Sequence, residues 1–142
     1  MSIKGKNILL GHGSGGKLTN DLINGIFLKK LSNKILSTLE DSAIIEQNKT
    51  KIAMTTDSYV VDPVFFPGGD IGKLCVCGTV NDISVSGATI KGISLGVIIE
   101  EGLDISILER VVESIKKTSR EAGVDIVTGD TKVVEKGKVD KI

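Results

Sequence analysis

Apolar residues recur at helical spacing in three stretches of the chain. The first covers residues 18–31, where one apolar stripe has polar residues outside it. The second covers residues 71–86 and follows Asp70, which is expected to be its N-cap. The third covers residues 105–122 behind Asp104. A glycine follows each of the last two stretches, as is typical of helix ends.

The third stretch has the clearest amphipathic pattern. Glu113 and Lys117 lie outside its apolar stripe at the spacing of an i,i+4 ion pair. The residues of the predicted apolar face are Ile105, Leu108, Val111, Val112, Ile115 and Ala122.

Apolar runs predict five strands, at residues 51–56, 88–99, 124–128, 132–135 and 138–142. The run 88–99 is apolar on both faces, so we expect a long buried strand, with β-bulges at Gly92 or Gly96. Strands mixed with helices predict an α/β (α+β) domain. The chain of 142 residues is expected to form one domain. It stops inside the last predicted strand, so we expect a fragment of a longer protein.

Composition narrows the range of partners. Lys plus Arg and Asp plus Glu each number 18, so no charge excess attracts nucleic acid or an anionic membrane. Basic residues within 1–6 lack the apolar segment of a signal peptide, and no apolar run approaches the ~20 residues of a membrane span. We therefore expect a cytoplasmic protein that binds neither nucleic acid nor membrane.

Two cysteines, Cys75 and Cys77, fall in the second predicted helix. Helical residues two apart do not face each other, so a shared metal or a disulfide is disfavoured. Both are expected to be buried free thiols.

Four aspartates at the ends of apolar runs are the main candidates for chemistry. They are Asp41, Asp57, Asp82 and Asp130. Mg²⁺ prefers oxygen ligands and takes one or two carboxylates plus phosphates, so four aspartates suggest more than one metal around a polyphosphate. The alternative is that they are turn and cap residues.

A glycine-rich loop precedes the first predicted helix and is a candidate for binding phosphate through its backbone amides. Its candidate residues are Gly13, Ser14, Gly15, Gly16 and Lys17. The spacing matches neither the P-loop nor the dinucleotide-binding fingerprint. His12, the only histidine, is either a catalytic base or a solvated loop residue.

Two polar groups of residues interrupt apolar elements. Asn81 and Asp82 are disfavoured in a buried helix, so they need a partner, either a metal–phosphate site or an internal hydrogen-bonded cap. Asp130, Thr131 and Lys132 follow a predicted strand and form either a turn or a set of phosphate and metal ligands.

In this order, the glycine-rich loop, Glu40-Asp41-Ser42-Ala43, Thr56-Asp57, Thr79-Val80-Asn81-Asp82-Ile83 and Gly129-Asp130-Thr131 resemble the ATP-binding half of the PurM-like superfamily. That superfamily includes aminoimidazole ribonucleotide synthetase, selenophosphate synthetase and thiamine-monophosphate kinase. The HypE family of hydrogenase maturation factors is the most similar, through residues 12–16, 67–72 and 129–134. Several relatives have two successive aspartates where this chain has Glu40-Asp41, so the role of Glu40 stays open.

The resemblance implies a PurM-like (AIR synthase-related) N-terminal domain. Its mixed sheet would be packed by helices and pair with the sheet of a second protomer in a homodimer, with ATP bound against a C-terminal domain. By resemblance, Asp41, Asp57, Asp82 and Asp130 bind Mg²⁺ and phosphates. Asn81 supports them, and Gly13 to Lys17 close over the nucleotide.

The resemblance also implies an activity. HypE-like enzymes use ATP to dehydrate a thiocarboxamide on a C-terminal cysteine to a thiocyanate, which supplies cyanide ligands for nickel–iron hydrogenase. The implied partners are the carbamoyltransferase HypF and the HypC–HypD complex. This chain contains neither that cysteine nor the second domain, so we expect it to be inactive alone. The alternatives are a phosphotransferase of the thiamine-monophosphate kinase type and a noncatalytic dimerisation module.

Overall fold

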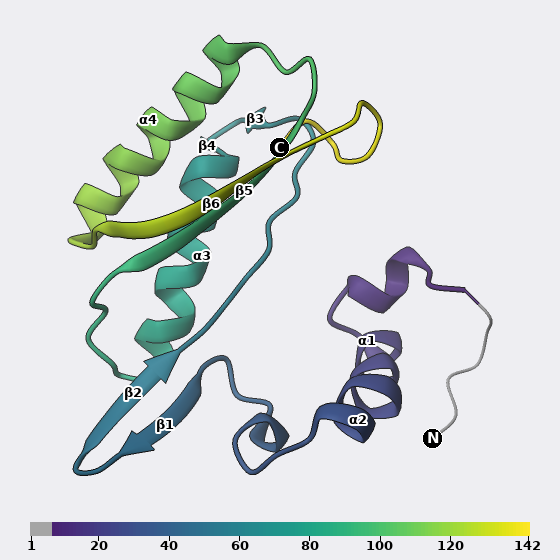
Figure 1. The fold of residues 1–142 in the computed structure, drawn as a ribbon, viewed down its shortest axis with the longest axis vertical. Coiled ribbons are helices and arrows are strands. Elements are labelled where there is room, and N and C mark those ends of the chain that lie inside the picture. The colour runs from purple at the N-terminus through teal and green to yellow at the C-terminus, as the bar shows by residue number, and fades with distance from the viewer. Residues whose placement is uncertain (1–6) are drawn as a thin grey trace.

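The computed structural model describes residues 7–142. The prediction that the N-terminus is not a signal peptide concerns residues 1–6, which lie outside the described part. Helical elements come first along the chain, a run of strands follows, and the last four elements alternate between helix and strand (Figure 1). In order, they are η1 (Leu10–Gly13), α1 (Lys17–Leu22), η2 (Ile23–Leu28), α2 (Lys29–Leu31), η3 (Leu36–Thr38), β1 (Ala43–Gln47), β2 (Thr50–Met54), β3 (Phe65–Phe66), β4 (Gly69–Asp70), α3 (Ile71–Val85), β5 (Ile93–Glu100), α4 (Ile105–Ala122) and β6 (Ile126–Val134).

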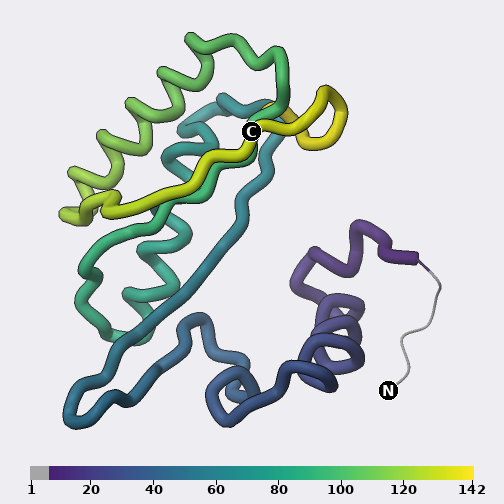
Figure 2. The backbone as a smooth tube through the Cα atoms, viewed as in Figure 1, coloured from purple at the N-terminus to yellow at the C-terminus, as the bar shows by residue number. Residues whose placement is uncertain are grey.

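The first predicted helix is confirmed, because α1, the π-helical turn η2 and α2 run on from one another over residues 17–31. This N-terminal helical segment packs mainly on itself and stands away from the rest of the chain (Figure 2). Its apolar stripe is therefore largely uncovered: Phe27 is 48% exposed and Leu31 is 60% exposed.

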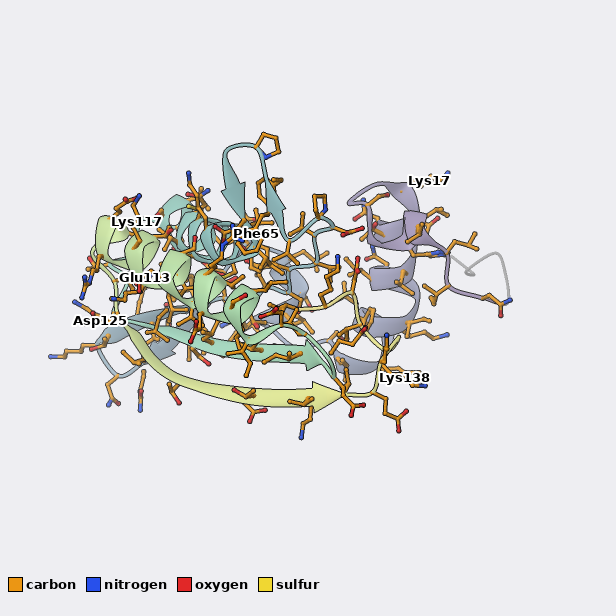
Figure 3. All side chains as sticks on the ribbon, turned by 90° about the horizontal axis from the view of Figure 1, so that it is seen from above. Lys17, Phe65, Glu113, Lys117, Asp125 and Lys138 are labelled. Carbon is orange, nitrogen blue, oxygen red and sulfur yellow. The ribbon has the colours of Figure 1, made fainter. Side chains whose placement is uncertain are left out.

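The core lies between α3, α4 and the parallel pair β5–β6. Both helices cover one face of this pair (Figure 3). Val76 of α3 and Val111 and Ile115 of α4 are buried there with Ile93 of β5. The helices approach closely at Gly72, where a Cβ would lie 2.6 Å from the carbonyl oxygen of Val111.

The predicted helix caps are confirmed. Asp70 Oδ1 accepts hydrogen bonds from the amides of Gly72 (2.7 Å) and Lys73 (3.1 Å). Asp104 accepts from the amide of Ser106, and Gly123 ends α4 in the left-handed conformation with φ of 66°.

One detail of the predicted helix 105–122 was wrong. Glu113 pairs with Lys116 at 2.9 Å rather than with Lys117, because i,i+3 neighbours also share a helix face. The predicted apolar face is also only partly covered: Val111 and Ile115 are buried, whereas Ile105 and Val112 are 72% and 50% exposed.

The strands differ more from the predictions. β1 was not predicted, although it forms an antiparallel hairpin with β2. β5 begins at Ile93 and alternates in exposure along its length, so it is not buried on both faces. Its register shift lies at Ile93/Ser94 and at neither glycine.

The last three predicted strands were also wrong in extent. β6 spans residues 126–134 without a break, because those residues pair continuously with β5. Residues 138–142 form no strand; the amide of Glu100 donates to the carbonyl of Lys141 there (2.9 Å). The α/β class holds, but the strands form two antiparallel pairs and one parallel pair.

One smaller prediction is resolved by side-chain exposure. Cys75 is half-buried but Cys77 is exposed, so only the first fits the buried-thiol prediction; both are free. Across residues 7–142, no helix combines the length and apolar character needed to cross a membrane.

Candidate functional site

Three of the four predicted aspartates meet where the β1–β2 hairpin reaches α3. Asp41 precedes β1, Asp57 follows β2, and Asp82 lies on α3. The hairpin register pairs Ala43 with Met54, which brings Asp41 beside Thr55. The Thr55 hydroxyl lies 2.9 Å from the carbonyl oxygen of Asp41 and 3.4 Å from Oδ2 of Asp82. Thr55 thereby links the base of the hairpin to the helix.

Asp57 has a defined partner of its own. The hydroxyl of Tyr59 donates to Asp57 Oδ2 (3.0 Å), and the phenol oxygen lies 3.3 Å from the hydroxyl of Thr79 on α3. The ring crosses α3 at Gly78, where a Cβ would lie 2.8 Å from Tyr59 Cζ. Tyr59 therefore connects the segment after β2 to the helix that carries Asp82.

Asp82 is the electrostatic centre of the cluster. Partial burial raises the pKa of Asp82, and the negative charge of Asp57, a hydrogen bond between these two carboxyl groups and the charge of Asp41 raise it further. Two carboxylates this close repel unless a proton or a cation lies between them. Burial likewise raises the pKa of Tyr59, so at neutral pH its hydroxyl keeps the proton that it donates.

The cluster fits a cation that is completed by other ligands. Within residues 7–142, no three His, Cys, Asp or Glu side chains form a ready-made metal-binding group. Mg²⁺, however, usually takes only one or two carboxylates and completes its shell with waters and phosphates. Asp57 and Asp82, with Asp41 beside them, match that partial donor set.

Asp130 reaches the same region from β6. Asp57, Tyr59, Asp130 and Lys132 line one cleft of about 880 Å³ beside β5. Asp130, Thr131 and Lys132 lie inside β6 and not in a turn. Alternation along the strand therefore puts Asp130 and Lys132 on one face and Thr131 on the other. The structure therefore separates Thr131 from its two sequence neighbours.

The glycine-rich loop does not join the aspartates. It belongs to the N-terminal helical segment, and Lys17 lies on this separate part of the chain (Figure 3). Within the loop, the amide of Gly15 donates to the Thr19 hydroxyl (2.9 Å). Residues 13–17 are exposed.

His12 and Asn81 both differ from what the sequence suggested. His12 is only 5% exposed, and its Nδ1 accepts from the amide of Leu9 (3.0 Å), so it stabilises its own turn and is not solvated. Asn81 lies beside Asp82 on α3, but it is exposed, so it needs no internal partner.

Sequence reasoning missed the roles of Thr55, Tyr59 and Thr79. Tyr59 carried a usable signal, because it is the only tyrosine and follows Asp57 by two residues, a spacing that puts both on one side of an extended segment. The contributions of Thr55 and Thr79 depend on contacts across 27 and 20 residues, which no local pattern indicates.

A protein-family model matches most of the chain. Residues 39–142, which contain all four aspartates, match the family described as AIR synthase related protein, N-terminal domain. The chain belongs to this family. The match confirms the predicted PurM-like fold, and the glycine-rich loop lies outside the matched residues.

Individual AIR synthase related proteins show which branch the chain resembles. It is 50% identical over 141 residues to carbamoyl dehydratase HypE of Escherichia coli K12, covering 96% of this chain and 42% of the relative. It is 49% identical to a chain in the crystal structure of a HypE–HypF complex, with a TM-score of 0.78 over 84% of this chain and 38% of that one. It is 57% identical to a HypE crystallised with ATP, with a TM-score of 0.63 over 95% of this chain and 40% of that one.

The extent and the identity of these matches decide what each one shows. The chain spans 42% of the length of its Escherichia coli relative. A structure of AaThiL with AMPPCP and TMP has a TM-score of 0.66 at 20% identity, which shows a shared fold alone.

Proposed function

We propose that this chain, residues 1–142, is the N-terminal ATP-binding domain of an ATP-dependent carbamoyl dehydratase of the HypE type. The observation that carries the proposal is the meeting of Asp57 and Asp82, with Asp41 beside them, in a chain 50% identical to a carbamoyl dehydratase. The HypE crystallised with ATP supports the choice of nucleotide. The relatives at 49–57% identity are named HypE, whereas AaThiL is only 20% identical, so sequence identity favours the HypE type over a phosphotransferase of the thiamine-monophosphate kinase type.

In the proposed reaction, the oxygen of a cysteine-bound thiocarboxamide takes the γ-phosphoryl group of ATP, and ADP leaves. The carbon–oxygen bond then breaks, and phosphate carries that oxygen away. The nitrogen loses both protons, and the thiocyanate that remains supplies a cyanide ligand for nickel–iron hydrogenase. The net change is removal of one water molecule, coupled to ATP hydrolysis.

The site residues of this proposal divide by chemistry. Asp41, Asp57 and Asp82 would hold Mg²⁺, which neutralises phosphate charge when bound, and Asp130 would join them from the cleft that it lines together with Asp57. The residues proposed to contact phosphate or support the metal ligands are Gly13, Ser14, Gly15, Gly16, Lys17, Asn81, Thr131 and Lys132. Because the glycine-rich loop stands apart from the aspartates, closing over the nucleotide would require this loop to move toward them.

Assembly is part of the proposal. A homodimer would cover apolar side chains that this chain leaves exposed on its strands, such as Ile52 (45%), Ile98 (52%) and Val133 (62%). HypF and a HypC–HypD complex are the proposed partners; the HypE–HypF crystal structure supports the first. An ATP-dependent enzyme with these partners would work in the cytoplasm.

Calorimetric titration of the chain with ATP, with and without Mg²⁺, tests the site. We expect Mg²⁺-dependent binding that Asp82→Asn weakens about tenfold or more, because the variant keeps the size of the side chain but loses a charged ligand. Asp125→Asn is the matched control, because Asp125 is exposed on the segment before β6 and is not among the hydrogen-bond partners of the cluster. Equal affinity in the wild type and Asp82→Asn would overturn the metal assignment.

A further inference from the structure

The side chain of Asp57 is oriented by the hydroxyl group of Tyr59, beside the carboxyl group of Asp82. Asp57 lies in the extended segment after β2, outside the paired strands, so no ladder hydrogen bonds orient this part of the chain. The Tyr59 hydroxyl donates to Asp57 Oδ2 at 3.0 Å. Without this bond, only the contact with the Asp82 carboxyl group would restrain the carboxylate.

The direction of that hydrogen bond follows from its neighbours. An ionised carboxylate only accepts, so Tyr59 donates its single proton to Asp57. The Thr79 hydroxyl, 3.3 Å from the phenol oxygen, must then donate to Tyr59. Thr79, Tyr59 and Asp57 thus form a chain of hydrogen bonds with one direction, which runs from α3 to the carboxylate.

The ring of Tyr59 has no room to shift toward α3. It lies against Gly78, the one position on that turn without a side chain, and a Cβ there would overlap the phenol hydroxyl. Tyr59 is also half-buried and packs against the hydrophobic core. Gly78 and Asp82 lie on the same helix, α3. Packing of the ring against Gly78 therefore also fixes the Tyr59 hydroxyl relative to Asp82.

These contacts have a consequence for cation choice. The Tyr59 hydroxyl occupies a lone pair on Oδ2 of Asp57, so coordination of a metal through a single oxygen is favoured over coordination through both. Mg²⁺ takes six ligands at 2.0–2.1 Å in a strict octahedron, whereas Ca²⁺ accepts six to eight at longer range and often binds a carboxylate through both oxygens. One-oxygen coordination by Asp57 suits the smaller ion.

We infer that Tyr59 is a positioning residue that restricts Asp57 to one-oxygen coordination and so sets a preference for Mg²⁺ over Ca²⁺ in nucleotide binding. The inference rests on the proposed function, since it requires the cation of a nucleotide complex to bind at Asp57. Tyr59 itself contacts Asp57 and Thr79 and acts on the cation only through Asp57.

The test is calorimetric titration of the 142-residue chain with ATP in the presence of Mg²⁺ or Ca²⁺. The wild type is expected to bind Mg-ATP more tightly than Ca-ATP, and Tyr59→Phe should lower this affinity ratio by about tenfold, as loss of an outer-shell partner does. Ser84→Ala is the matched control, because it removes a hydroxyl from the same helix that bonds only to a backbone carbonyl, that of Val80.

Each outcome separates the two proposals. A wild type that binds neither complex would overturn the proposed site and with it the role of Tyr59. A wild type that prefers Mg-ATP, with an unchanged ratio in folded Tyr59→Phe, would overturn the positioning role alone. Should Tyr59→Phe fail to fold, Thr79→Val keeps the ring and removes the donor that orients its hydroxyl; a ratio equal to that of the wild type would also overturn the role.

Discussion

Gly78 lies where the ring of Tyr59 crosses α3, and a Cβ on this glycine would come within 2.8 Å of the ring carbon Cζ. Gly78 is not in a left-handed conformation, so backbone freedom does not explain the glycine. The missing side chain instead lets Tyr59 reach Thr79 on the helix and Asp57 on its own segment at the same time. The position of Asp57, a candidate metal ligand, thus depends on Gly78, which has no side chain.

We expect Gly78→Ala to destabilise the chain even though alanine is the better helix former. The added methyl group must displace the Tyr59 ring, and overpacking of this kind costs about 1–3 kcal/mol. The free energy of unfolding from urea denaturation measures the loss. Gly96→Ala is the control, because a Cβ there meets no atom within 4 Å. Equal losses in both variants would show that the Tyr59 contact is not responsible.

Asp70→Ala should destabilise the chain by about 2 kcal/mol, because it removes an N-cap and a half-buried interhelical hydrogen bond together. Asp70 caps α3 through Oδ1, and its Oδ2 accepts from the Ser114 hydroxyl of α4 at 2.6 Å. Thermal and urea unfolding check the value. Ser114→Ala removes only the second interaction, so it should cost less; a larger loss in Ser114→Ala would contradict this division.

The stability of the cation-free chain should depend on pH through Asp82. Its pKa in the folded chain is raised above the ordinary value of 3.8, first by burial and then by Asp57, so the folded state holds this proton more tightly than the unfolded state does. As pH rises from 3.8 through the raised folded value, the unfolded state loses its proton first, and the free energy of unfolding falls.

Asp82→Asn removes this dependence. In EDTA at pH 7 we expect a higher urea midpoint for the variant than for the wild type, with the difference shrinking as pH falls toward 3.8. The variant should at the same time lose Mg-ATP affinity, which is a trade of function for stability. A wild type that is the more stable of the two at pH 7 without a cation would contradict the raised pKa.

We expect the chain to form a homodimer through its strands. Ile98 on β5 is 52% exposed, and the neighbouring strand β6 exposes Val127 and Val133 (63% and 62%), which together favour an apolar two-fold interface. Sedimentation equilibrium at tens of micromolar measures the association. Ile98→Glu should weaken it, whereas Ile105→Glu, at a 72% exposed position on α4, should not. A monomeric wild type would refute the interface.

The chain alone should bind Mg-ATP without turning it over. Asp41 and Asp57 are exposed, and the glycine-rich loop stands apart from them, so water is not excluded from a bound phosphate. The chain also offers no carrier that would hold a carboxamide against the γ-phosphate. Phosphate release from the purified chain should stay at background, and multiple turnovers would show that the site is already complete.

Local chemistry in the sequence determined much of the fold. Asp70 and Asp104 were recognised as caps and Gly123 as a helix end, because these roles depend on a few adjacent residues and on conformations that particular residue types favour. Motif order also identified the family before any coordinates, since the spacing of the aspartates is itself a property of the sequence. The predicted strands were less accurate: β5 and β6 have boundaries that depend on pairing with each other.

Only the tertiary structure decided which polar residues meet. It joined Asp57 to Asp82 and revealed Thr55, Tyr59 and Thr79 as their partners, because these contacts cross from the hairpin to α3. It also separated Thr131 from Asp130 by strand alternation and left Lys17 on a helical segment that stands apart from α3. Side-chain direction and the packing of distant segments depend on the whole chain, so adjacency in the sequence could not reveal them.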